Sequence, residues 1–141
     1  MRILIVFFFL NLSAESISQI LPGMERDEIL EYMSLSHKDF VFREPPNVNE
    51  LDFIKYEHVS GDKTLLVFMT ENGYCSFTRL MVDIDYLEEI IENFNREYDN
   101  TGEMKWTLTE QGKKFSIDIE ESEWLFTVTV RSAKEGNKQI F

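Results

Sequence analysis

The chain has 141 residues, of which 43% are hydrophobic and 13% aromatic, and its 26 acidic and 14 basic residues give a net charge of −12. This length and composition predict one folded domain and exclude an intrinsically disordered chain. A surface this negative repels phosphate backbones and anionic lipid headgroups, which excludes nucleic acid and membrane surfaces as expected partners.

Residues 1–18 have the pattern of a secretory signal peptide. Arg2 precedes an apolar run from Ile3 to Leu10, and a region of small residues follows. We therefore expect export to the periplasm or out of the cell, with cleavage before Gln19 or, alternatively, before Ile17. The apolar run is far shorter than the roughly 20 residues that span a bilayer, so we expect no stable membrane anchor. The alternative is that this run forms an N-terminal strand.

The mature protein is expected to be a single α+β domain over residues 19–131, followed by a polar C-terminal tail over 132–141. Its first predicted element is a helix from Met24 to Met33, which has acidic residues in its first turn and an apolar stripe at helical spacing. The next stretch contains Pro45-Pro46 and cannot be helical there. Within it, Phe40–Phe42 either forms a short strand or covers an open edge of a sheet.

Three strands are predicted next, over 51–59, 63–70 and 74–82. Gly61-Asp62 separates the first two, and Asn72-Gly73, a strong hairpin signal, separates the second from the third. Treating both as two-residue loops places Phe68 opposite Phe77 and Tyr56 opposite Val67.

The order then repeats. A helix is expected from Asp83 to Tyr98, ending at Asn100-Thr101-Gly102, and strands are expected over 103–109, 114–120 and 124–131. The predicted fold is therefore α+β, with two helix-plus-three-strand units that form an antiparallel sheet of about six strands and place both helices on one face.

This arrangement resembles small exported bacterial α+β proteins without an assigned activity. The similarity rests on Lys105-Trp106 after the second helix and on the segment 123–127 that opens the last strand. The opening Pro22-Gly23-Met24 with Glu28-Ile29 is also similar to the first helix of the β-lactamase-inhibitor-protein and outer-membrane-assembly-lipoprotein group. The chain differs from that group because it has neither a lipid-attachment cysteine nor paired cysteines.

The sequence predicts no catalytic, metal or cofactor site. Cys75 is the only cysteine, so there is no intramolecular disulfide, and it is expected to be a small buried or half-buried apolar residue. His37 and His58 lack the local spacing of a zinc site. Ser60 beside His58 is interpreted as a hairpin neighbour, because no nucleophile elbow is present.

The two predicted meanders differ on their outer faces. In the second meander, apolar residues that include Trp106 and Trp124 alternate strictly with polar ones, as in a sheet with one solvated face. In the first meander, the outer face is unusually apolar and is the candidate partner surface, with the residues Leu66, Phe68, Cys75, Phe77, Arg79 and Met81. The alternative is that Phe40–Phe42 or Ile140-Phe141 folds over this surface.

The leading functional hypothesis is an exported, non-catalytic binding module that uses this surface for an unidentified protein partner or for self-association. The alternative is an extracytoplasmic enzyme that acts on a small solute through carboxylates such as that of Glu57, which would require a deep pocket with converging polar groups.

Overall fold

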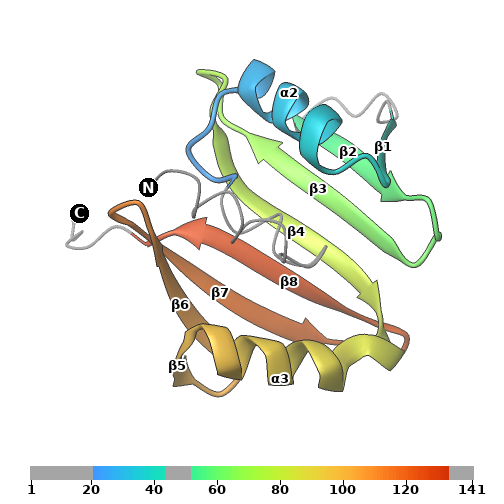
Figure 1. The fold of residues 1–141 in the computed structure, drawn as a ribbon, viewed down its shortest axis with the longest axis vertical. Helices are drawn as coiled ribbons and strands as arrows, with labels where there is room; N and C mark the ends of the chain where they lie inside the picture. Colours follow the sequence, from blue (N-terminus) through green and yellow to red (C-terminus); the bar gives the residue numbers. More distant parts are fainter. Residues whose placement is uncertain (1–20, 44–51, 134–141) are drawn as a thin grey trace, which may run out of the picture.

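The computed structural model describes residues 21–43 and 52–133, which form one antiparallel sheet of eight strands and two α-helices (Figure 1). The predicted signal peptide lies outside the described residues. The first half of the described chain contains α2 (Arg26–Ser36), β1 (Phe40–Arg43), β2 (Phe53–His58), β3 (Lys63–Met69) and β4 (Cys75–Asp83). The second half contains the 3₁₀ turn η2 (Ile84–Tyr86), α3 (Leu87–Glu97), β5 (Asp99–Gly102), β6 (Lys105–Glu110), β7 (Lys113–Glu121) and β8 (Leu125–Ser132).

The strand order is β1-β2-β3-β4-β8-β7-β6-β5. Every strand pairs with its neighbour in the chain except at the centre, where β4 pairs with β8. Exchanging the two halves therefore leaves the strand order unchanged, and the sheet has the topology of a two-fold arrangement of helix-plus-four-strand units.

The α+β class and the antiparallel sheet are confirmed, but the predicted units of three strands and the total of about six strands are wrong. The two additional strands are the four-residue edge strands β1 and β5. Of the two alternatives for Phe40–Phe42, the short strand is confirmed: these residues belong to β1, which pairs with β2. The sequence predicts that Asn100-Thr101-Gly102 ends the helix. Instead, α3 stops at Glu97 and the chain extends at once, because Asp, Asn and Gly are poor helix formers; Asp99, Asn100 and Gly102 pair with β6.

Local sequence explains where the helices begin. At α2, the backbone N–H of Glu25 donates to Glu28 Oε1 over 3.0 Å, so the last residue before the helix is held by a side chain from its first turn. At η2, Asp83 Oδ1 accepts from the backbone N–H of Asp85 over 2.9 Å. Neither helix is long and apolar enough to cross a membrane, within the part of the chain that the structure describes.

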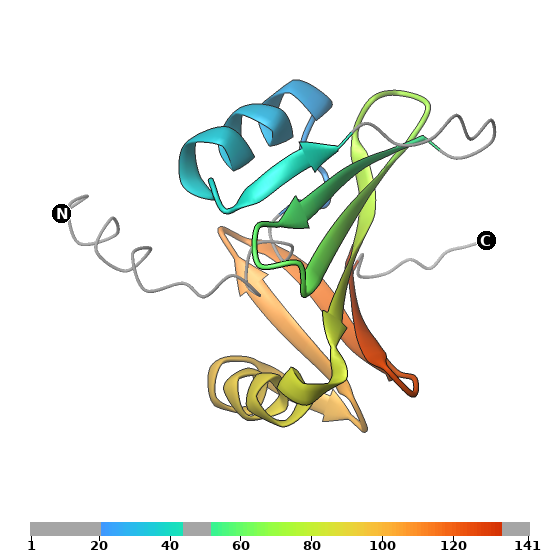
Figure 2. The ribbon, with the colours of Figure 1, turned by 90° about the vertical axis from the view of Figure 1, so that its right-hand side faces the viewer.

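Both helices cover the same face of the sheet, as Figure 2 shows with α2 and α3 to one side of the strands. Their apolar residues Ile29, Met33, Ile90 and Phe94 are buried against this inner face. The largest side chain in the core is Trp106, which is 1% exposed, packs edge to face on Phe94 and donates from Nε1 to Asn95 Oδ1 over 2.9 Å.

The other tryptophan does not lie where the alternation placed it. Trp124 is 74% exposed, because it belongs to the turn between β7 and β8 rather than to a strand. The inner-face alternation of β8 begins at Phe126, which is fully buried. The predicted alternation was therefore continued into the turn before β8, which wrongly placed Trp124 on the buried face.

Candidate functional site

The outer face of the sheet, opposite the helices, carries a continuous row of aromatic and cationic side chains. Residues paired across neighbouring strands point to the same face, and the register aligns Phe53 with Phe68, Phe68 with Phe77, and Phe77 with Arg131. This row crosses β2, β3, β4 and β8. We call it, together with Leu66, Arg79 and Met81, the outer patch.

The three phenylalanine rings contact one another along the row. Phe68 and Phe77 are stacked, with ring centroids 4.6 Å apart and an interplanar angle of 16°. Phe53 packs on Phe68 at 5.6 Å with a tilt of 54°. All three side chains are half-buried, so each ring contacts its neighbours and keeps part of its surface exposed to solvent.

Two arginines lie over these rings. The guanidinium carbon of Arg79 is 5.3 Å from the centroid of Phe77 and 5.8 Å from that of Phe68. The guanidinium carbon of Arg131 is 5.0 Å from the centroid of Phe77. Cation–π contacts at these distances hold the two charged groups against the row.

The structure brings together five of the six residues predicted for the partner surface. Leu66 lies opposite Arg79, as predicted, and both Leu66 and Met81 are half-buried on the outer face. The predicted pairing of Phe68 with Phe77 is confirmed. The predicted pairing of Tyr56 with Val67 is wrong, because a four-residue turn rather than a two-residue loop joins β2 to β3 and pairs Tyr56 with Leu65 instead.

Cys75 is the exception, since it is buried on the inner face and only 4% exposed. A β-bulge causes this reversal: Phe77 pairs with Phe68, but Met69 pairs with Cys75, which leaves Ser76 as an extra residue. The extra residue shifts the alternation and turns Cys75 toward the core. Burial raises the pKa of its thiol to about 12, so the thiol is protonated at neutral pH.

Phe53 and Arg131 belong to the outer patch but are not among the residues predicted for it from the sequence. Phe53 lies two residues before Lys55 in the same strand, so the alternation of side chains could have placed it on the outer face. Alternation along the last predicted strand, 124–131, places Arg131 on the outer face, but the residues beside it there depend on the pairing of β4 with β8. No local signal in the sequence reports that pairing.

Phe40–Phe42, one of the two segments considered as a cover for this surface, does not lie over it. These residues belong to the edge strand β1, which lies beside β2 in the plane of the sheet. The other segment, Ile140-Phe141, lies outside the described residues.

Beside the outer patch, Glu57 contacts two cations. Its Oε2 is 3.3 Å from Lys55 Nζ, and its Oε1 accepts from Arg43 Nε over 3.2 Å. The hydrogen bond from Lys55, followed by that from Arg43, holds the pKa of Glu57 below its usual range. A carboxylate stabilised in its charged form is a weaker proton acceptor, so this geometry does not favour Glu57 as a general base.

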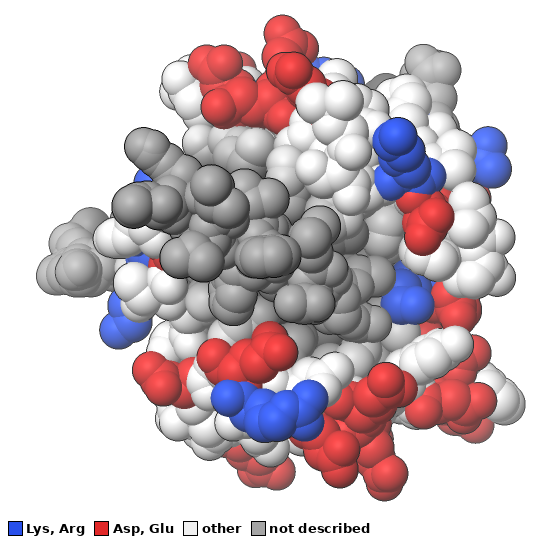
Figure 3. Space-filling view, in the orientation of Figure 1, with Lys and Arg blue, Asp and Glu red and all other residues white. Residues whose placement is uncertain are grey.

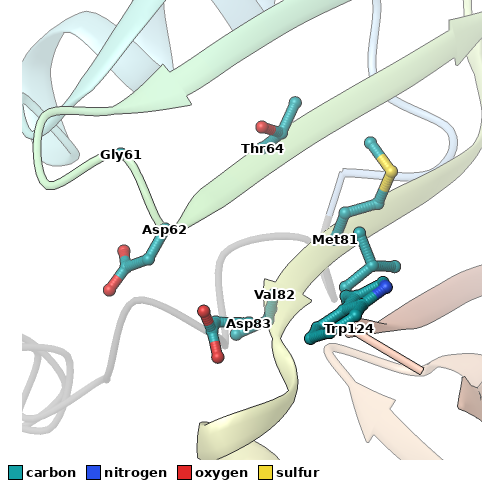
Figure 4. A pocket seen from close by; sticks show the side chains of 8 residues that line it. Gly61, Asp62, Thr64, Met81, Val82, Asp83 and Trp124 are labelled. Atoms are coloured by element: carbon teal, nitrogen blue, oxygen red, sulfur yellow. The ribbon is translucent and has the colours of Figure 1, made fainter. Parts of the chain in front are cut away.

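An open hollow of about 230 Å³ lies at the end of the outer face next to Met81 (Figure 4). Asp62 from the β2–β3 turn, Asp83 from the end of β4 and Trp124 from the β7–β8 turn surround it. Asp62 is already engaged, because it accepts from Ser60 Oγ and, over 2.8 Å, from the Tyr86 hydroxyl. These two hydrogen bonds, the first being the stronger influence, hold the pKa of Asp62 below its usual value.

His58 and Ser60 belong to the same turn and stabilise it. His58 Nδ1 is 2.7 Å from Ser60 Oγ, while the Ser60 hydroxyl donates to the Asp62 carboxylate. The backbone N–H of Ser60 also donates to His58 Nδ1 over 3.1 Å, so these contacts all lie within the connection from β2 to β3, as the hairpin interpretation expects. Within residues 21–43 and 52–133, no group of three or more histidine, cysteine, aspartate or glutamate side chains is arranged to bind a metal ion.

Acidic side chains cluster on the helix side of the molecule. Figure 3 shows the helix side, where Asp and Glu gather over both helices. These acidic residues include Asp27, Glu28 and Glu31 around α2 and Glu88, Glu89 and Glu92 on α3. The cations Arg79 and Arg131 of the outer patch lie on the opposite face of the sheet.

Comparison of the chain with protein-family models, curated proteins and solved structures gave no match. The resemblances noted in the sequence therefore stay predictions.

Proposed function

We propose that this protein is an exported, non-catalytic binding module that contacts a protein partner through its outer patch. The observation that carries this proposal is the row Phe53–Phe68–Phe77, in which three aromatic rings lie side by side on the sheet face opposite both helices. Aromatic side chains and arginines are the residues most enriched at energetically important positions of protein interfaces. The phenylalanine rings thus form the apolar centre of the outer patch, and the guanidinium groups supply positive charges that contact this centre.

The shape of the outer face supports binding more than catalysis. A catalytic site needs a concave pocket into which polar groups converge. The hollow beside Met81 is open to solvent, and its carboxylate Asp62 is occupied by hydrogen bonds from Ser60 and Tyr86. Glu57, the carboxylate considered for acid–base work, is paired with cations.

Substitution of the stacked rings tests the proposal. Phe68→Asp and Phe77→Asp should each leave the domain folded, because the introduced carboxylate remains at a half-exposed position on the outer face. The loss of one aromatic stack should cost about 0.5–1.5 kcal/mol beyond the lost apolar contact. Each variant should nevertheless lose the partner, since a charge would replace the apolar centre of the interface.

The measurement is affinity capture from an extract of the native cell envelope, followed by mass spectrometry. Leu35→Asp is the matched control, because Leu35 is an apolar residue that is 67% exposed on α2, on the helix side. Proteins retained by the wild type and by Leu35→Asp but lost from both phenylalanine variants would support the proposal. It is refuted if the folded phenylalanine variants retain the same proteins as the wild type, or if both variants unfold at room temperature.

A further inference from the structure

We propose that the partner segment recognised by the outer patch is acidic and presents carboxylates to Arg79 and Arg131 while its apolar residues pack on the phenylalanine row. This inference rests on the proposed function of the same face and names the chemistry of its partner.

The position of the two arginines is the first argument. Both guanidinium carbons lie over the ring of Phe77, at 5.3 and 5.0 Å from its centroid, so they are no farther apart than the sum of these distances. A carboxylate bound between the two guanidiniums would be attracted by both positive charges. A guanidinium that contacts a ring keeps its N–H donors for a carboxylate, with which it forms paired hydrogen bonds.

Neither arginine has an acidic partner in the part of the chain that the structure describes. Among residues 21–43 and 52–133, no carboxylate lies within 4.0 Å of the guanidinium nitrogens of Arg79 or Arg131, whereas Arg43 and Lys55 on the same face both contact Glu57. The chain carries 26 acidic residues against 14 basic ones, so carboxylates are in excess. Two arginines kept apart from them on an aromatic surface are available to a carboxylate from elsewhere.

Charge also favours an acidic partner segment over the two other possible occupants of the outer patch, which are the C-terminal tail and a second copy of the chain. The tail 134–141 contains Lys134, Lys138 and Glu135, so its side chains bring an excess of positive charge toward the arginines. A second copy of the chain would bring a further net charge of −12, and two such copies repel each other over a long range. A short acidic segment has few charges and experiences mainly the local field of Arg79 and Arg131.

Three synthetic peptides provide the probe. Each is an extended, fluorescently labelled octamer in which phenylalanine alternates with glutamate, with glutamine or with lysine. Their binding to the full chain is measured by fluorescence anisotropy at two salt concentrations. We expect the glutamate peptide to bind at least about tenfold more tightly than the glutamine peptide, and its advantage in affinity over the lysine peptide to be larger still. The affinity of the glutamate peptide should fall as the salt concentration rises.

The variants separate this inference from the proposed function. The double substitution Arg79→Gln and Arg131→Gln should reduce affinity for the glutamate peptide to that for the glutamine peptide and leave the latter unchanged. Phe68→Asp should weaken both peptides. Leu35→Asp, on the helix side, is the matched control and should bind both peptides as the wild type does. Circular dichroism establishes that each variant is folded.

Four outcomes would overturn the inference. Equal affinity for the glutamate and glutamine peptides, with Phe68→Asp weakening both, would leave the outer patch as a binding surface without a preference for acid. No binding of the glutamate peptide up to about 1 mM would exclude specific recognition. A concentration-dependent dimer in sedimentation that the arginine substitutions abolish would assign the patch to a second copy. Peptide binding only after Ile140→Ser and Phe141→Ser would assign it to the tail. Binding that is unaffected by Phe68→Asp would instead refute the proposed function itself.

Discussion

Replacing the two tryptophans one at a time tests the assignment of the buried face. Trp106 is 1% exposed and Trp124 is 74% exposed, so truncation to alanine should have very different effects. A buried aromatic side chain of about 200 Å² contributes about 5 kcal/mol at 25 cal/mol per Å². Allowing for partial collapse of the site, Trp106→Ala should lower the free energy of unfolding by about 3–5 kcal/mol.

Two contacts specific to Trp106 support the upper part of this range. The indole packs edge to face on Phe94 at 5.3 Å, which is worth about 0.5–1.5 kcal/mol beyond the buried area. It also donates to Asn95, and a hydrogen bond of this kind contributes about 0.5–1.5 kcal/mol. Trp124→Ala should change stability by no more than about 0.5 kcal/mol.

Urea unfolding followed by far-ultraviolet circular dichroism measures both effects. The chain contains only these two tryptophans, so fluorescence of Trp124→Ala reports Trp106 alone and should be blue-shifted until the protein unfolds. Equal destabilisation by the two substitutions, or an unchanged urea midpoint for Trp106→Ala, would refute the assignment of Trp106 to the core.

Two further predictions concern Cys75 and the N-terminus. The Cys75 thiol should react with a thiol reagent at neutral pH only after unfolding in urea, because it is buried and its pKa is raised to about 12. The unfolded thiol ionises near its ordinary pKa of 9.0, while the folded thiol stays protonated up to about pH 12. Cys75 should therefore lower the free energy of unfolding as pH rises from about 9 toward 12, an effect absent from Cys75→Ala. Rapid labelling of the native protein would contradict this placement. For export, intact-mass analysis of protein made in its own cell should show loss of residues 1–18, and retention of Met1 to Ser18 would contradict it.

The sequence predicted the fold class because its local signals are strong. Asn72-Gly73 and the alternation on both sides of it placed Phe68 opposite Phe77, and the apolar stripe of α3 identified a helix. Features that depend on pairing between distant strands were not predicted. The contact of β4 with β8 brings Arg131 next to Phe77, yet these residues are more than 50 positions apart in the chain.

Features that depend on one residue were also missed. The extra residue Ser76 reverses the direction of Cys75, although Asn72-Gly73 predicts a regular hairpin. The four-residue edge strands contain too few residues to establish an alternating pattern. The candidate site was therefore predicted where it lies within one hairpin, and incompletely where it extends beyond it.

The exchange of halves that preserves the strand order has a consequence for the outer patch. The scaffold repeats, but the chemistry of its outer face does not: β2, β3 and β4 present phenylalanines there, whereas the equivalent strands β6, β7 and β8 present mainly threonine, serine and charged residues. Arg131 is contributed by the polar half and lies on a ring of the apolar half. Neither half carries the whole outer patch, so the proposed recognition surface and the joining of the two halves depend on the same pair of central strands, β4 and β8.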